Sequence, residues 1–216
     1  MAEKSLPVET LGPDHTGLIL FDTLAGYLHP DDDAKAKALA EWGVLENMQR
    51  LVATARELGV KVFYTHADHS ADGSDTVPRL SDTDMDLNPW GARVRSFLPR
   101  HHRGTKGAEI AAEVAPEDGD VMVPKHRWNA FFQTHLELSM RSRGLDTVVI
   151  AGGSTDVGIA ATAFAARDAD FGLVVARDAC FAHRGPNNDF FMDRIFPRMG
   201  RVMNVDQICA LMKAGA

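Results

Sequence analysis

The sequence has little cysteine, no long apolar run and no excess of positive charge. Its only cysteines, Cys180 and Cys209, fall near a predicted strand end and in a predicted C-terminal helix, so they offer no disulfide framework. Such low cysteine content suits a reducing cytoplasm, where we expect this protein. No apolar run approaches membrane-spanning length, and the N-terminal residues lack the apolar core of a signal peptide, so nothing predicts export.

Positive charge is also in the minority, with 23 Lys and Arg against 30 Asp and Glu and a formal net charge of -7. Nucleic-acid binding requires clustered Lys and Arg on one face, so the balance argues against it and favours a small-molecule substrate. The one basic cluster, at residues 99–104, lies between predicted elements and is expected to be a solvated loop. The length of 216 residues and the 45% hydrophobic content predict a single domain over residues 1–216.

Short apolar runs rich in β-branched residues alternate with segments of helical spacing. The runs predict six strands, at residues 16–22, 61–67, 120–125, 147–153, 171–178 and 201–205. The intervening patterns predict helices at residues 34–58, 131–143, 157–169 and 206–214. Several strands are apolar almost throughout, as strands covered on both faces are. The order therefore predicts an α/β fold, three layers deep, with a six-stranded, mostly parallel sheet.

Residues 68–104 interrupt this alternation with many Asp, Ser, Gly and Pro residues. A loop of this length in a compact domain is usually functional or disordered. This one carries a few apolar side chains that it could bury, at Trp90, Val94, Phe97 and Leu98. We therefore expect an ordered flap.

Three of the predicted strands end in residues that carry chemistry. Asp22 follows the first strand, Lys125 ends the third, and the glycine-rich turn at residues 152–158 follows the fourth. Ligands of an open parallel sheet bind beyond the carboxyl ends of its strands, so we expect these groups to converge. An acid and an ammonium there make an acid/base pair, and helix N-terminal amides can stabilise developing negative charge. Taken alone, Asp22 could equally be an N-cap or turn residue.

These motifs resemble those of the isochorismatase-like, or cysteine hydrolase, superfamily over nearly the whole chain. Asp22 matches the acid that follows the first strand in that family, and KHRWNAF, from Lys125 to Phe131, matches its lysine segment. GGSTDVG followed by AATAFAARDA matches its G-x-x-T-x-x-C turn and the helix downstream. The resemblance implies an isochorismatase-like hydrolase fold. In most members the cysteine is the nucleophile of an amidase, the acid is its general base and the lysine assists electrostatically.

This chain has Gly158 at the position of that cysteine. The superfamily members with glycine there include the isochorismatases, which hydrolyse a vinyl ether without a covalent intermediate. KHRWNAF, NPWG and GRVM in this sequence resemble segments of those enzymes. The resemblance therefore implies that Asp22, as general acid, protonates an enolpyruvyl ether, after which water completes its hydrolysis to pyruvate and an alcohol. Lys125 would bind the substrate carboxylate, and Gly158 would leave room for the substrate.

Two positions depart from true isochorismatases, because Ala67 stands at their glutamine and Ser154 at the tyrosine of their turn. The resemblance thus implies the hydrolase class more firmly than isochorismate itself as substrate. The residues that we expect to contact substrate lie at strand ends and in the long loop: His66, Arg79, Trp90, His126, Trp128 and Ser154.

Other interpretations stay open at this point. Water activated by Asp22 as a base, opposite the amides near Ser154 and Gly158, would hydrolyse an amide or related C–N bond. A serine or threonine nucleophile, Ser154 or Thr155, is a less favoured variant. A catalytically inactive binding homologue is a further alternative, but the retention of Asp22 and Lys125, whose desolvation costs stability, weighs against it.

We expect no metal and no cofactor. His66, Asp68 and His69 form a His-x-Asp-His cluster, but its order differs from the metal cluster of the nicotinamidases, and such loops are more often simply polar. The turn at 152–158 lacks both Rossmann and Walker spacing. The resemblance implies a homo-oligomer, a dimer or tetramer, with the helix at 157–169 and the flap at its interfaces.

Overall fold

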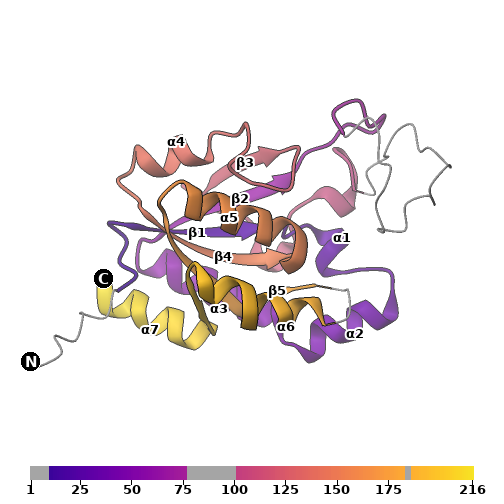
Figure 1. Ribbon diagram of the computed structural model, residues 1–216. Coiled ribbons are helices and arrows are strands. Elements are labelled where there is room, and N and C mark those ends of the chain that lie inside the picture. Colours follow the sequence, from indigo (N-terminus) through magenta and orange to yellow (C-terminus); the bar gives the residue numbers. More distant parts are fainter. Residues whose placement is uncertain (1–9, 77–100, 183–185) are drawn as a thin grey trace, which may run out of the picture.

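A computed structural model describes residues 10–76, 101–182 and 186–216 of the chain. Its central sheet has the strand order β3-β2-β1-β4-β5-β6, and each pair of neighbours is parallel (Figure 1). The strands are β1 (Thr16–Phe21), β2 (Lys61–Ala67), β3 (Val121–Lys125), β4 (Thr147–Gly153), β5 (Gly172–Phe181) and β6 (Arg201–Met203). The predicted six-stranded sheet is confirmed, and the described strands are parallel throughout rather than mostly parallel.

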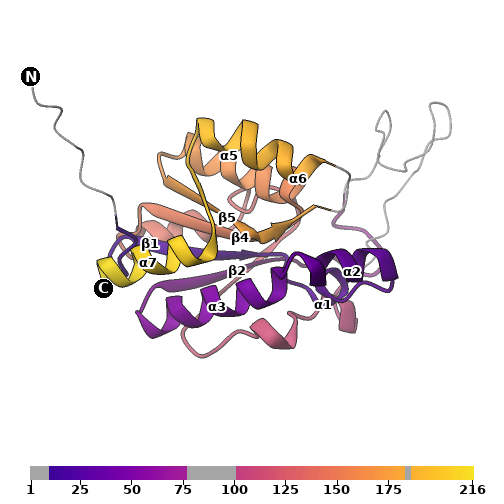
Figure 2. The ribbon, with the colours of Figure 1, turned by 90° about the horizontal axis from the view of Figure 1, so that it is seen from below.

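Helices cover both faces of the sheet, so the predicted three layers are present (Figure 2). One face carries α3 and α7, whereas α5 lies on the other face. The α-helices are α1 (Ala25–Leu28), α2 (Asp33–Glu41), α3 (Val44–Glu57), α4 (Leu136–Arg141), α5 (Ala160–Asp168), α6 (Asn187–Phe190) and α7 (Val205–Gly215). Within the described residues, each helix is too short or too polar to span a bilayer.

Strand β1 shows how the sequence builds two cores. All six of its residues are buried, and successive side chains point to opposite faces. Leu18 and Leu20 join the core beneath α3 and α7, whereas Ile19 and Phe21 join the core beneath α4 and α5. A strand covered on both faces must be apolar throughout, which explains the continuous apolar run in the sequence.

The helix predicted over residues 34–58 is wrong as a single element. The structure has two helices there, α2 and α3, separated at Gly43. Gly43 has a φ of 63°, in the left-handed region that glycine adopts at low cost and that ends a helix.

The helix predicted over residues 131–143 is shorter than expected, because α4 begins only at Leu136. Side chains hold the preceding turns instead: Asn129 Oδ1 accepts from the Phe131 amide at 2.8 Å, and Thr134 Oγ1 donates to the Ala130 carbonyl at 2.5 Å. Such local bonds compete with helical ones. The helix predicted from Val157 also begins later, because Thr155–Ile159 forms a π-helical turn before α5.

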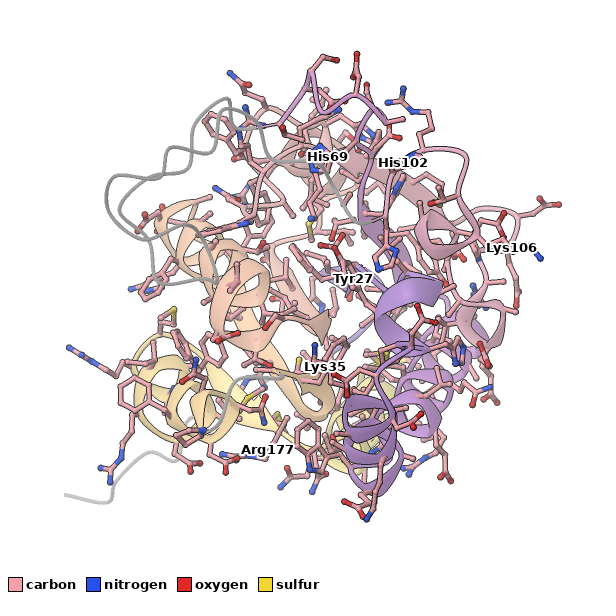
Figure 3. All side chains as sticks on the ribbon, turned by 90° about the vertical axis from the view of Figure 1, so that its right-hand side faces the viewer. Tyr27, Lys35, His69, His102, Lys106 and Arg177 are labelled. Carbon is pink, nitrogen blue, oxygen red and sulfur yellow. The ribbon has the colours of Figure 1, made fainter. Side chains whose placement is uncertain are left out.

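The sheet has its topological switch point between β1 and β4. The chain leaves β1 for β2 on one side and later returns to β4 on the other, and ligands of open α/β sheets bind at the carboxyl ends of the strands beside such a point. The ends of these strands touch at Gly152, where an added Cβ would lie 2.0 Å from the Phe21 carbonyl oxygen. Only glycine at position 152 therefore allows the backbones of β1 and β4 to come this close at their carboxyl ends. Figure 3 looks onto this side of the molecule, with Tyr27, Lys35, His69, His102 and Lys106 labelled around it.

Candidate active site

Asp22 and Lys125 form a buried ion pair at the carboxyl edge of the sheet. Lys125 Nζ donates to Asp22 Oδ2 at 2.7 Å, and the two side chains are 4% (Lys125) and 12% (Asp22) exposed. Asp22 follows β1 and Lys125 ends β3, with β2 between these strands. The expected convergence of the two residues is therefore present. Two desolvated charges are stable here because each neutralises the other.

The backbone of Asp22 directs its carboxylate into the site. Its amide donates to the Thr65 carbonyl at 2.8 Å, which continues the pairing of β1 with β2. Its φ of 46° then turns the chain sharply, in a region that L-residues other than Asn and Asp seldom adopt. As a result Asp22 Oδ1 accepts a hydrogen bond from the Ala67 amide at 2.7 Å. Sequence reasoning missed this contact, since a backbone amide leaves no signal in a residue pattern.

Phe21 connects Lys125 to the beginning of the helix that follows β4. Lys125 Nζ lies 4.2 Å from the centre of the Phe21 ring, within cation–π range. On Gly158, an added Cβ would lie 2.3 Å from Cε1 and 2.4 Å from Cζ of the same ring. Phe21 was not among the expected site residues, because an apolar strand residue indicates core packing. Lys125, which pairs with Asp22, and Gly158 are thus brought together around one phenyl ring.

The turn after β4 is fixed by polar contacts to α6. Ser154 Oγ donates to Asp156 Oδ1, and Asp156 Oδ2 accepts from Asn187 Nδ2 at 2.6 Å. Thr155 Oγ1 donates to Asn188 Oδ1 at 2.7 Å. The hydroxyl groups of the two possible side-chain nucleophiles are therefore both engaged by neighbouring side chains. The Val157 and Ile159 amides donate to the Ser154 carbonyl at 3.2 and 3.1 Å, which closes the beginning of this helical segment onto Ser154. Amides at the beginning of a helix that have no such bond can serve as donors toward an anion.

Thr162 joins the lysine segment to α5. This buried threonine accepts a hydrogen bond from the Ala130 amide at 3.0 Å and donates to the Trp128 carbonyl at 3.4 Å. The contact fixes the chain that leaves Lys125 against the helix that begins beyond Gly158. The Trp128 side chain itself is 60% exposed, so it does not pack under any described segment.

His66 lies half-buried at the end of β2, close enough to the ion pair to interact electrostatically with it. Burial lowers the pKa of His66 below its ordinary value of 6.5, and the nearby Lys125 ammonium lowers it further. The carboxylates of Asp68 and Asp22 act in the opposite direction. An imidazole kept neutral beside an acid and an ammonium can donate or accept a proton in a reaction.

His126 and His69 share one carboxylate, that of Asp75. His69 Nδ1 lies 3.3 Å from Asp75 Oδ1, and His126 Nε2 lies 3.6 Å from Asp75 Oδ2. Burial acts to raise the pKa of Asp75, but hydrogen bonds from Ser70 and His69 outweigh it and lower the pKa to about 2. Figure 3 labels His69 at the rim of the edge. Sequence reasoning missed Asp75, although it follows the conspicuous His and Asp cluster by only a few residues.

The His66, Asp68 and His69 cluster does not gather as one ligand set. Arg103 binds the Asp68 carboxylate through Nε at 2.8 Å and Nη2 at 2.9 Å, while His69 turns to Asp75. Over residues 10–76, 101–182 and 186–216, the structure contains no group of three His, Cys, Asp or Glu residues that could hold a metal ion.

Neither cysteine replaces the missing nucleophile. Cys180 is buried in β5 with its Sγ 3.6 Å from the Ile150 carbonyl, and burial raises the pKa of its thiol to about 12. Cys209 packs partly buried against the core beneath α7. Two expected substrate contacts, Arg79 and Trp90, lie outside the described residues.

The fold and the site describe a three-layer α/β/α enzyme with a buried acid–ammonium pair at the switch point of its sheet. Sequence comparison identifies the family to which it belongs. The Isochorismatase domain matches residues 16–207. The isochorismatase family protein YecD of Escherichia coli O157:H7 is 34% identical over 165 residues, covering 76% of this chain and 81% of YecD.

Two further relatives are enzymes named for amide hydrolysis. Maleamate amidohydrolase of Pseudomonas putida is 30% identical over 161 residues, covering 74% of this chain and 70% of that enzyme. The crystal structure of N-carbamoylsarcosine amidase from Thermoplasma acidophilum has a TM-score of 0.68 and 25% identity, covering 89% of this chain and 97% of that one. The chain belongs to the isochorismatase-like family of hydrolases, as the motifs predicted.

Proposed function

We propose that this chain hydrolyses an amide or related C–N bond in a small carboxylate-bearing molecule, with water in place of a side-chain nucleophile. The observation that carries the proposal is the buried Asp22–Lys125 pair beside a helical turn without space for a side chain at Gly158. The naming of the relatives after maleamate and N-carbamoylsarcosine supports the C–N bond.

Asp22 is the proposed general base. A carboxylate has about four lone-pair sites, and the structure fills two of them, with the Ala67 amide and with Lys125 Nζ. The remaining sites can accept a hydrogen bond from a water molecule. Asp22 would remove a proton from this water as its oxygen bonds to the carbonyl carbon, and would return that proton to the nitrogen as the C–N bond breaks. The products are a carboxylic acid and an amine or ammonia.

Lys125 and the helical turn are the proposed stabilisers of negative charge. The tetrahedral intermediate places a negative charge on the former carbonyl oxygen, and preorganised donors stabilise it most where water is excluded. The Lys125 side chain is almost fully buried, and the helical segment that contains Gly158 lies against the same Phe21 ring. His66, His126, Trp128 and Ser154 remain proposed substrate contacts, as do Arg79 and Trp90.

Enolpyruvyl ether hydrolysis, our first expectation from the sequence, is the second candidate. It is favoured by the glycine at position 158, which the resemblance links to isochorismatases. The amidohydrolase relatives favour the C–N alternative instead. In the ether reaction Asp22 would act as an acid and donate a proton to carbon, so the two candidates differ in its protonation state.

We also propose that the chain functions as one domain and as a homo-oligomer. The continuous sheet, in which strands from Thr16 to Met203 take part, supports a single domain. Exposed aromatic side chains, at Phe164 on α5 and at Trp128 and Phe132 between β3 and α4, support self-association. The cytoplasmic location stays a prediction from the low cysteine content.

A substrate panel tests the function directly. Maleamate, N-carbamoylsarcosine, other small amides, isochorismate and a simple enolpyruvyl ether would be incubated with the native protein, with Asp22→Asn and with the surface control Asp206→Asn. We expect ammonia release that Asp22→Asn reduces by about 10²- to 10⁴-fold, while Asp206→Asn retains it. Pyruvate release from the ethers alone would favour the second candidate. Turnover that survives Asp22→Asn would refute both.

A further inference from the structure

The ring of Phe21 occupies the space in which any side chain at position 158 would begin. Phe21 is the last residue of β1 and is 1% exposed. A Cβ on Gly158 would lie 2.3 Å from Cε1, 2.4 Å from Cζ and 3.3 Å from Cδ1 of this ring. The first two distances are far inside van der Waals contact. A side chain therefore fits at position 158 only if the ring moves or is removed.

The ring has little freedom to move. The backbone of Phe21 pairs with Thr65 on β2 and with Gly152 on β4, so the strand is held on both sides. The side chain belongs to the core beneath α4 and α5, and Lys125 Nζ lies over its face at 4.2 Å. A close-packed protein core accommodates added side-chain volume only at a cost in stability.

We infer that Phe21 is a specificity-determining residue, which excludes a side-chain nucleophile from position 158 and so leaves water as the attacking group. The inference deepens the proposed function, on which its catalytic meaning rests. The steric relationship itself concerns only Phe21 and Gly158. It follows that the side chain of a cysteine introduced at position 158 fits in the site only when residue 21 is replaced by a smaller one.

A double-mutant cycle tests the steric relationship without any substrate. Gly158→Ala would be compared in the native background and in the Phe21→Val background, where the outer ring atoms are absent. We expect Gly158→Ala to lower the Tm by about 3–10 °C in the native background and by less than half as much in the Phe21→Val background. Phe63→Val is the matched control, since Phe63 is buried in the same core but is not among the nearest atoms to Gly158. Equal Tm losses in all three backgrounds would overturn the inference.

Thiol chemistry tests its consequence for the site. Alkylation of the cysteine introduced by Gly158→Cys would be followed by peptide mass spectrometry, alone and together with Phe21→Val. We expect alkylation at least about tenfold faster in the double variant. The pH midpoint of its alkylation rate should lie below the ordinary thiol pKa of about 8.5, because the Lys125 ammonium and position 158 lie against the same ring in the native protein. Adding Lys125→Met should move that pH midpoint upward, because the ammonium that stabilises the thiolate is then absent.

Each outcome separates this inference from the proposed function. If Gly158→Cys alone fails to fold, alkylation can still be measured in the double variant with Phe21→Val. Folding of the double variant would then by itself support the steric exclusion. Equally fast alkylation with and without Phe21→Val would overturn the inference. A positive thiol result together with silence on the substrate panel would leave the inference intact and count against C–N hydrolysis.

Discussion

Lys125 Nζ and Asp22 Oδ2 are 2.7 Å apart in space and 103 residues apart in the sequence. The two side chains lie in the desolvated edge of the sheet, where an unpaired charge is far more costly than at the surface. The pair therefore links stability to chemistry: the same proximity that prepares an acid and an ammonium for catalysis also makes each depend on the other for its burial.

Removing one partner should destabilise the protein more than removing both. We expect Lys125→Met to lower the free energy of unfolding by about 3–5 kcal/mol, because it leaves the Asp22 carboxylate buried without its cation. The double variant Asp22→Asn with Lys125→Met should recover much of this loss, since no charge is then buried. Urea unfolding of these two variants and of the native protein measures the effect. Lys61→Met is the control, because Lys61 Nζ makes its 3.0 Å bond to the Gly119 carbonyl at the exposed surface.

The histidines His66 and His15 should titrate on opposite sides of pH 6.5. Burial lowers the pKa of His66 below 6.5. Burial also acts to lower the pKa of His15, but hydrogen bonds to the Thr10 carbonyl and the Asp14 carboxylate outweigh it and raise the pKa above 6.5. Imidazole NMR signals followed against pH measure both groups in one sample. A His66 midpoint at or above that of His15 would contradict the electrostatics of the site.

The two titrations have opposite effects on stability. For His66, the unfolded state binds the proton more tightly than the folded state. Its contribution to the free energy of unfolding is therefore complete above pH 6.5 and is lost as the pH falls through the lower pKa of the folded state. For His15, the folded state binds the proton more tightly than the unfolded state. Its contribution to the free energy of unfolding is therefore complete below pH 6.5 and is lost as the pH rises through the higher pKa of the folded state. Urea unfolding of His66→Gln and His15→Gln, measured at several pH values around 6.5, should show that each variant loses one of these two pH dependences of the free energy of unfolding.

The sequence was sufficient to predict the sheet, its layers and the pairing of Asp22 with Lys125. Strand ends of a parallel sheet meet at one edge, so residues that follow apolar runs could be brought together without coordinates. The division of the 34–58 segment at Gly43 was not predicted, although a glycine within a helical pattern is a known stop signal.

Other parts of the site could not be predicted from residue types. In the sequence, Phe21 has the pattern of an ordinary core residue. Only the three-dimensional structure shows that its ring lies against Gly158 and Lys125. The Ala67 contact is made by a backbone amide, which every residue but proline carries. The pairing of Asp75 with His126 depends on how a loop folds back, which no periodicity records.

Thr162 should be required for its hydroxyl group. Thr162→Val keeps the shape of the side chain but leaves the buried Ala130 amide without its acceptor, which costs about 1–3 kcal/mol. We expect unfolding at lower urea concentration and weaker turnover, because the segment that carries Lys125 loses its attachment to α5. Thr162→Ser restores the oxygen and should recover both properties. Full stability of Thr162→Val would mean that the Ala130 amide finds another acceptor.

Ser154→Ala separates water from serine as the attacking group. Ser154 Oγ donates to Asp156, whose other carboxylate oxygen accepts from Asn187 at 2.6 Å, so the hydroxyl proton is held by the Asp156 carboxylate beside α6. If water attacks, removing this hydroxyl should leave kcat within about tenfold of the native value, with KM carrying most of any change. If serine attacks, kcat should fall by several orders of magnitude, as it does for hydrolases that lose their nucleophile. Mass spectrometry after rapid quenching provides a second measurement, since a serine mechanism accumulates an acyl-enzyme on the peptide containing Ser154 and a water mechanism leaves that peptide unmodified.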